Sequence, residues 1–278
     1  MSMDLPRLSA LQYVQPLREG GSLPAVVLTD DGLYVVKFRG AGQGPRALIA
    51  EIIAGLIARA LDLPVPDLAL VETQELFGRA EPDPEIQDLL RASVGTNIGL
   101  RYLDGAFNFA AAPAGDTMSD ALAARVVWFD AFMTNPDRTP RNVNILVWQR
   151  RPYLIDHGAA LYAHHDWAGV DEARTRTPFP LIRQHALLGL ADDIETVDEE
   201  FATRLTDDVL THVLGAVPDD LFEDERIRGE FASTEDQRRR YLDYLRTRLD
   251  PPREFARTAE SERRRARTAV PARLSARR

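Results

Sequence analysis

The sequence predicts an α+β protein in two lobes, in which strands come first and helices follow. Short β-rich runs separated by turn signals dominate the first hundred residues and enclose one helical segment. Beyond them, helical periodicity dominates and is interrupted by one small hairpin. Because strands and helices are segregated along the chain, we expect the α+β class, with a seam between the lobes near residues 100–105.

The first lobe is predicted to be strand-rich with one long helix. Asp30-Asp31-Gly32 is a turn signal between two strands, and Pro64 and Pro66 end the long helix. The expected elements are strands at 13–17, 25–28 and 33–38, a helix at 46–61, a strand at 68–71, loop plus a short helix at 77–90, and a strand at 98–103.

The second lobe is predicted to be mainly helical. Thr117 with Asp120, and Ser233 with Asp236, have the spacing of capping boxes that begin helices. The expected elements are a helix from 117 to 133, short strands at 144–148 and 152–155, and helices at 182–190, 199–215, 219–230 and 234–249.

Composition limits the class of protein. The chain has 278 residues, of which 45% are hydrophobic and 28% charged, so it can bury a sizeable core. It has no cysteine, which excludes disulfides, thiolate catalysis and cysteine-ligated zinc. No apolar run is long enough to span a membrane, and the N-terminus lacks the pattern of a signal peptide. We therefore expect a cytoplasmic protein without a membrane partner.

Charge is unevenly distributed. Residues 251–278 carry nine arginines and three glutamates, whereas the whole chain has a net charge of −9. An acidic body makes nucleic acid an unlikely partner. Apart from Phe255, the C-terminal segment has no helical apolar periodicity, and it contains three prolines. We therefore expect residues 251–278 to form an Arg-rich, disordered tail.

Lys37 is the only lysine, beside 33 arginines. An ammonium is a compact point charge that fits between phosphate oxygens, whereas a guanidinium is a broad planar fork. Lys37 ends the β-rich run that begins at Leu33. A surviving lysine can be an accident of composition, so this observation depends on motifs further along the chain.

Three polar residues of the second lobe are expected to converge. Asp137 and Asn142 lie in the loop before the hairpin, and Asp156 follows its second strand. Because paired strands bring their ends together, these oxygen ligands suit Mg²⁺, which takes few protein ligands beside phosphate and water. Ordinary turn chemistry is the alternative for each piece taken alone.

The order of these residues resembles the protein-kinase pattern of a strand lysine, a helix glutamate, an aspartate with an asparagine five residues later, and Asp-Phe-Gly. Here the residues are Lys37, Glu51, Asp137, Asn142 and Asp156-His157-Gly158. Over residues 11–165 the chain is most similar to the HipA-like kinases and the related phosphoinositide 3/4-kinases, in part through Leu154-Ile155-Asp156-His157-Gly158 and Leu63-Pro64-Val65-Pro66.

The resemblance implies a two-lobed protein-kinase-like fold and a role for each motif residue. Lys37 would contact the phosphates of ATP, and Glu51 would orient it. Asp137 and Lys37 would be the catalytic residues, with Asp137 positioning or deprotonating the acceptor hydroxyl, while Asn142 and Asp156 would hold Mg²⁺. Gly20-Gly21-Ser22 would form a backbone cradle over the phosphates, although a plain β-turn is an equally good interpretation. Residues 98–103 would form the hinge against adenine.

The resemblance also implies domains: an N-lobe at 1–103, a C-lobe at 104–250 and the tail at 251–278. The function it implies is ATP- and Mg²⁺-dependent transfer of phosphate to an alcohol, with a protein serine or threonine as the acceptor. Two alternatives stay open: a small-molecule or lipid kinase with the same core, and a pseudokinase that binds ATP as an interaction module. A small partner protein is a further expectation.

The sequence departs from the family pattern in three places. Asn135-Pro136 precedes Asp137 where a histidine is usual, Thr139 replaces the histidine of Asp-Arg-His, and His157 replaces the phenylalanine of Asp-Phe-Gly. These departures bear on substrate and catalytic rate more than on nucleotide binding.

Overall fold

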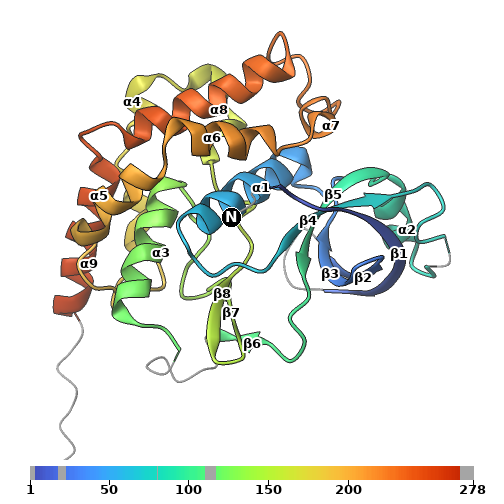
Figure 1. Cartoon of the computed structure of the whole chain (residues 1–278), viewed down its shortest axis with the longest axis horizontal. Helices are drawn as coiled ribbons and strands as arrows, with labels where there is room; N and C mark the ends of the chain where they lie inside the picture. Colours follow the sequence, from blue (N-terminus) through green and yellow to red (C-terminus); the bar gives the residue numbers. More distant parts are fainter. Residues whose placement is uncertain (1–3, 18–22, 80, 110–116, 270–278) are drawn as a thin grey trace, which may run out of the picture.

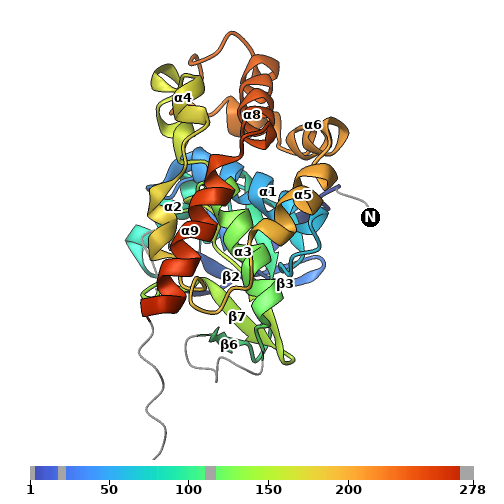
Figure 2. The same ribbon diagram turned by 90° about the vertical axis from the view of Figure 1, so that its left-hand side faces the viewer.

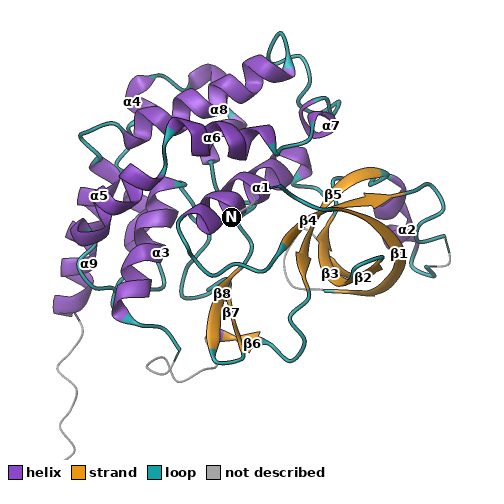
Figure 3. Cartoon of the chain, in the orientation of Figure 1, coloured by secondary structure: helices purple, strands orange, loops and turns teal. Residues whose placement is uncertain are grey.

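The computed structural model describes residues 4–17, 23–79, 81–109 and 117–269. It has a strand-rich N-terminal part and a helical C-terminal part (Figures 1 and 3). The α+β class predicted from the sequence is confirmed. The elements of the N-terminal part are β1 (Arg7–Pro16), β2 (Ala25–Thr29), β3 (Gly32–Lys37), α1 (Gly44–Ala60), β4 (Leu68–Thr73), α2 (Pro84–Arg91) and β5 (Gly95–Arg101).

The five strands of the N-terminal part close into a barrel in the order β1-β2-β3-β5-β4. Four of the five strand pairings are antiparallel. The fifth, between β1 and β4, is parallel and closes the barrel. Closure leaves no free edge, and alternate side chains, including Val27, Tyr34 and Val71, fill the interior. Lys37, at the end of β3, lies opposite Ile98 of β5.

Helix α1 is apolar on all sides because it is covered on all sides. Its residues from Ala47 to Ala58 are buried without exception. It contacts β5 on one side and the helices α6 and α7 on the other (Figure 1). Gly55 permits the approach of β4, since a Cβ there would meet the Leu68 side chain at 2.5 Å. The helix that carries Glu51 is thus fixed by both parts of the protein.

The helical part begins with a small sheet of order β6-β7-β8. No described helix combines the length and the hydrophobicity that crossing a membrane requires. Its elements are β6 (Phe107–Asn108), α3 (Asp120–Phe132), β7 (Ile145–Trp148), β8 (Arg151–Leu154), the 3-10 turns η2 (Tyr162–His165), η3 (Trp167–Gly169) and η4 (Pro180–Gln184), and the helices α4 (Glu172–Thr175), α5 (Glu195–Arg204), α6 (Asp207–Gly215), α7 (Asp219–Phe222), α8 (Thr234–Leu249) and α9 (Glu254–Ala269).

Helix boundaries follow local capping chemistry, and two of them correct the sequence predictions. Ser119, not Thr117, caps α3, because its side chain accepts a hydrogen bond from the Leu122 backbone. The helix expected at 199–215 is interrupted, since the Thr206 side chain caps a new helix, α6. Ser233 caps α8 as expected.

Two other expected helices are much shorter. In place of a helix at 182–190 the chain forms the 3-10 turn η4 and then irregular backbone. In place of a helix at 219–230 it forms α7, whose four residues are followed by turns.

The C-terminal segment differs most from the prediction. We expected a disordered tail from residue 251, but residues 254–269 form α9, which packs along α3 and η4 (Figure 2). Phe255, Ala256 and Ala259 are buried in the main core, where Phe255 contacts the Trp128 ring. One aromatic residue and two alanines on one face anchor the helix, while its arginines cover the other. The prediction was therefore wrong for α9; residues 270–278 lie outside the described residues.

Candidate active site

Lys37 and Glu51 form a buried ion pair. The Lys37 Nζ lies 2.7 Å from Glu51 Oε2, and the Glu51 side chain is fully buried in α1. Lys37 also lies 2.5 Å from Asp156 Oδ1, and this carboxylate is 41% exposed. The one ammonium of the chain therefore joins strand β3, helix α1 and the segment that follows β8.

Glu51 also binds the segment after β8 directly. Its Oε2 accepts a hydrogen bond from the backbone N–H of His157 at 2.8 Å. The His157 ring is buried, with its Nδ1 3.4 Å from Glu51 Oε1 and its face near the Phe129 ring. Asp156 itself has a φ of +56°, a conformation that aspartate tolerates better than most residues. These contacts hold the Asp156 side chain next to Lys37.

The buried charges are stabilised by one another. Burial alone would raise the pKa of Glu51, but the Lys37 ammonium and the His157 contacts outweigh it and hold that pKa well below its usual value. Burial alone would lower the pKa of Lys37, but Glu51 and Asp156 outweigh it and raise that pKa. Both residues are therefore ionised at neutral pH.

Asp137 is held by two amides from its own loop. Its Oδ2 accepts hydrogen bonds from Asn142 Nδ2 at 2.9 Å and from Asn144 Nδ2 at 3.2 Å. The Asn144 carbonyl in turn accepts a hydrogen bond from the Ile155 backbone at 3.0 Å. This backbone contact connects the Asp137 loop to the residue directly before Asp156.

A buried network that sequence reasoning missed supports the same loop. Arg138 donates from Nε to Asp130 Oδ2 at 2.6 Å and from Nη1 to the Asn144 carbonyl. Asp130 also accepts from Asn135 at 2.8 Å and lies 2.9 Å from His185 Nε2. Burial would raise the pKa of Asp130, but Arg138 and His185 outweigh it and lower that pKa. The available signal was a carboxylate, Asp130, within the apolar run that ends helix α3.

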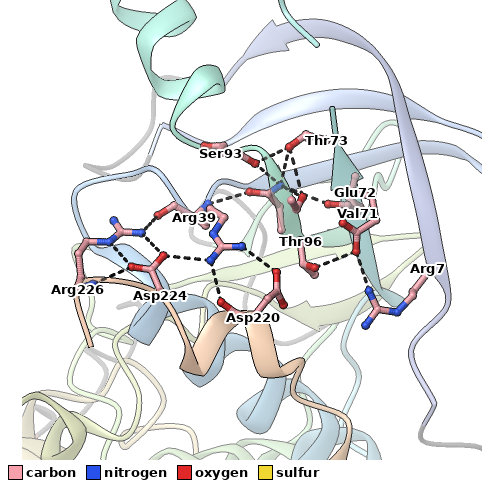
Figure 4. A network of polar contacts seen from close by, with 12 residues as sticks. Arg7, Arg39, Val71, Glu72, Thr73, Ser93, Thr96, Asp220, Asp224 and Arg226 are labelled. Atoms are coloured by element: carbon pink, nitrogen blue, oxygen red, sulfur yellow. Dashed lines mark hydrogen bonds and ion pairs between the residues drawn. The ribbon is translucent and has the colours of Figure 1, made fainter. Parts of the chain in front are cut away.

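A second missed network fixes the backbone just beyond Lys37 (Figure 4). Arg39 binds Asp220 through its guanidinium at 2.8 Å, and its backbone N–H donates to the buried Asn97 side chain at 2.9 Å. Arg226 donates to the Arg39 carbonyl at 2.6 Å and to Asp224 at 2.8 Å. Helix α7 and the turn after it are thereby tied to the end of β3.

The structure thus brings most of the predicted residues together, in two adjacent groups. Lys37, Glu51 and Asp156 form one group; Asp137 and Asn142 form the other. Gly20-Gly21-Ser22 lie outside the described residues. Residues 98–103 include the end of β5, next to β3, and their expected contact with adenine stays a prediction. No group of three or more His, Asp or Glu side chains that could hold a metal occurs among the residues that the structure describes.

A kinase of known structure has a similar fold. A crystal structure of the Helicobacter pylori proinflammatory kinase CtkA is similar, with a TM-score of 0.52 and 11% sequence identity over 94% of this chain and 98% of that chain. At that identity the likeness shows the fold alone. A comparison with curated proteins finds no match.

The family follows from the sequence match. The model of the HipA-like kinases matches residues 13–175, which is more than half of the chain. The protein therefore belongs to the HipA-like kinase family, as the motif resemblance predicted.

Proposed function

We propose that this kinase transfers a phosphoryl group from ATP, with Mg²⁺, to a serine or threonine hydroxyl of a protein. The observation that carries the proposal is the Lys37 ammonium, shared between Glu51 at 2.7 Å and Asp156 at 2.5 Å. Phosphoryl transfer needs positioning and charge neutralisation more than covalent chemistry. A rigidly held point charge beside a partly exposed carboxylate suits that requirement.

The donor atoms of the site fit a magnesium ion. Asn142 uses its amide nitrogen on Asp137, so its Oδ1 remains available. Asp156 uses Oδ1 on Lys37, and no described residue forms a hydrogen bond or ion pair with its Oδ2. Two protein oxygens are typical of Mg²⁺, which takes its other ligands from water and phosphate. When bound, the ion would offset the negative charge of the phosphates.

Asp137 is proposed to act on the acceptor. Both amides bind its Oδ2, and no described residue forms a hydrogen bond or ion pair with its Oδ1. The free Oδ1 would accept the hydrogen bond of the substrate hydroxyl and take its proton as the phosphoryl group transfers. The buried Arg138–Asp130 pair holds the loop in place behind it.

We further propose that the protein works as two lobes in the cytoplasm, where ATP is available. The barrel and α1, residues 1–103, would be the nucleotide-binding lobe, and residues 104–250 the lobe that carries Asp137 and Asp156. Since α9 packs on α3, we assign it to the second lobe.

The experiment is phosphate transfer from radiolabelled ATP, with autophosphorylation as the first readout and nucleotide-induced thermal shift as the second. Asp137→Asn keeps the shape of the side chain and removes the base. We expect transfer to fall about 100-fold or more while the shift with Mg·ATP persists. An Asp137→Asn variant that transfers phosphate at the wild-type rate would refute the role of Asp137. A wild-type protein with a thermal shift but no transfer would favour the pseudokinase.

A further inference from the structure

Two exposed arginines beside the Asp137 loop have side chains without a partner among the described residues. Most described arginines bind carboxylates or carbonyls within the chain, as Arg39, Arg138 and Arg253 do. The side chains of Arg141 and Arg183 form no hydrogen bond or ion pair with any residue that the structure describes. The same holds for four other described arginines, Arg79, Arg150, Arg151 and Arg239. Arg141 and Arg183 differ from these four because they line one cavity together.

The cavity lies between the Asp137 loop and η4, and we call it the Arg141–Arg183 cavity. Its volume is about 590 Å³, and residues 139–141, 183–185, 188, 189 and 266 line it. The two arginines are its charged residues. His185, in its wall, is neutral: burial lowers its pKa, its Nδ1 accepts a hydrogen bond from the Leu187 backbone, and its Nε2 faces Asp130. The cavity is therefore electropositive in a chain of net charge −9.

A second cavity, whose lining includes Thr134 and Pro136 at the start of the loop, lacks this property. It has a volume of about 680 Å³ and includes Pro136 and Phe179 in its lining. Its charged residues are Asp171 and Arg174, and Arg174 already binds Asp166 at 2.9 Å. Of these two cavities, the Arg141–Arg183 cavity is the one whose lining includes arginine side chains without a partner among the described residues.

The position of this cavity connects it to the acceptor. Its wall begins at Thr139, whose backbone N–H donates to the Asp137 carbonyl at 3.0 Å. Arg141 directly precedes Asn142, the residue that holds the Asp137 carboxylate. A substrate segment that presents its hydroxyl to Asp137 would therefore place neighbouring residues near the two guanidinium groups. Guanidinium groups bind carboxylates strongly because they donate two parallel hydrogen bonds.

We propose that the Arg141–Arg183 cavity binds acidic side chains of the acceptor protein, so that the kinase selects serines or threonines flanked by aspartate or glutamate. The inference rests on the proposed function. The body of the protein is acidic, but the cavity beside the candidate catalytic residue is lined by two arginines.

The test uses three series of synthetic serine peptides with acidic, neutral or basic flanking residues, and kcat/KM for each. For the wild-type protein we expect acidic peptides to exceed neutral ones by about tenfold, as one charge-assisted contact at a partly exposed site provides. The double variant Arg141→Glu/Arg183→Glu should invert the ratio of acidic to basic peptides. Arg239→Glu, an exposed and unpartnered arginine on α8, is the matched control and should leave the ratio unchanged.

A ratio is used because it cancels any general loss of activity in the variants. The double variant Arg141→Ala/Arg183→Ala should bring the acidic-to-basic ratio close to one. A wild-type preference for basic or neutral peptides would overturn the inference, as would an acidic preference that survives the charge reversal. Autophosphorylation without transfer to any peptide would overturn it too, yet leave the proposed function standing. Failure of the proposed function looks different: the wild type would transfer no phosphate above an Asp156→Ala background.

Discussion

The carboxylate of Glu51 accepts a hydrogen bond from the backbone N–H of His157 at 2.8 Å, across 106 positions of sequence. The same oxygen atom lies 2.7 Å from Lys37 Nζ. One buried side chain therefore fixes the strand that carries Lys37 relative to the segment that carries Asp156. The contact depends on the backbone of residue 157, which explains why histidine can stand where the family pattern has phenylalanine.

Glu51→Gln should destabilise the protein and reduce catalysis together. The variant leaves the buried Lys37 ammonium with Asp156 as its remaining carboxylate. Breaking a buried ion pair typically costs about 3–5 kcal/mol of stability. Because the Asp156 contact remains, we expect the free energy of unfolding to fall by about 3 kcal/mol. Urea unfolding and kcat measure the two effects. A loss of activity at unchanged stability would mean that Glu51 acts only on the nucleotide.

Lys37→Arg should reduce turnover more than stability. The positive charge is kept, but a broad fork replaces a point donor between two carboxylates and the phosphates. We expect kcat to fall on the order of 100-fold, as when one preorganised donor is lost from a site of charge stabilisation. Steady-state kinetics and circular dichroism provide the comparison. Wild-type rates would show that the lone lysine is an accident of composition.

Asp224→Asn should weaken the contact between α7 and the end of β3 in a pH-dependent way. Hydrogen bonds from Arg226 and Arg39 lower the pKa of Asp224 to about 2. A carboxylate with a depressed pKa stabilises the folded state above its unfolded pKa of about 4, and the effect is lost as pH falls through about 2. At pH 7 we expect a loss of about 1 kcal/mol after allowing for solvent screening.

Unfolding curves at several pH values test this prediction, since the difference between wild type and Asp224→Asn should shrink below pH 4. Glu225→Gln is the control, because Glu225 is 85% exposed and pairs only with Arg228 at 3.3 Å among the described residues. A difference that stays constant from pH 7 to pH 2.5 would contradict an ionic origin.

Removal of α9 should destabilise the protein, contrary to what the sequence indicated. Phe255→Ala would leave a cavity beside Trp128 and cost about 3–5 kcal/mol. Truncation after Asp250 should cost more, because Ala256 and Ala259 are buried as well. Arg257→Ala, on the exposed side of the same helix, should change the free energy of unfolding by less than about 0.5 kcal/mol. A truncated protein with an unchanged melting temperature would restore the interpretation of a dispensable tail.

The sequence was most informative where local chemistry decides structure. Ser233 marks the start of α8 because a capping side chain acts within three residues. Lys37 and Glu51 were predictable as a pair because a strand and the next helix carry them in a known order. Both residues lie within the range 13–175 that the model of the HipA-like kinases matches.

What the sequence did not reveal depends on distant contacts. The buried Asp130 meets His185 across 55 positions, and Arg39 meets Asp220 across 181. Helix α9 has too few apolar residues for a periodic pattern, and its stability comes from packing on α3. Only the folded chain shows that most of the described arginine side chains have partners, whereas those of Arg141, Arg183 and four others have none among the described residues.

The central claim is that Asp156 and Lys37 organise Mg²⁺-dependent phosphate transfer from ATP. The most direct measurement is transfer from radiolabelled ATP by the wild type and Asp156→Ala, each with Mg²⁺ and with EDTA. The Asp156 side chain is 41% exposed and Lys37 keeps Glu51 as its buried partner, so the variant should stay folded, with a modest loss of stability. We predict Mg²⁺-dependent transfer by the wild type and a loss of at least about 100-fold in Asp156→Ala. Equal transfer by both proteins, or wild-type transfer that persists in EDTA, would contradict the claim.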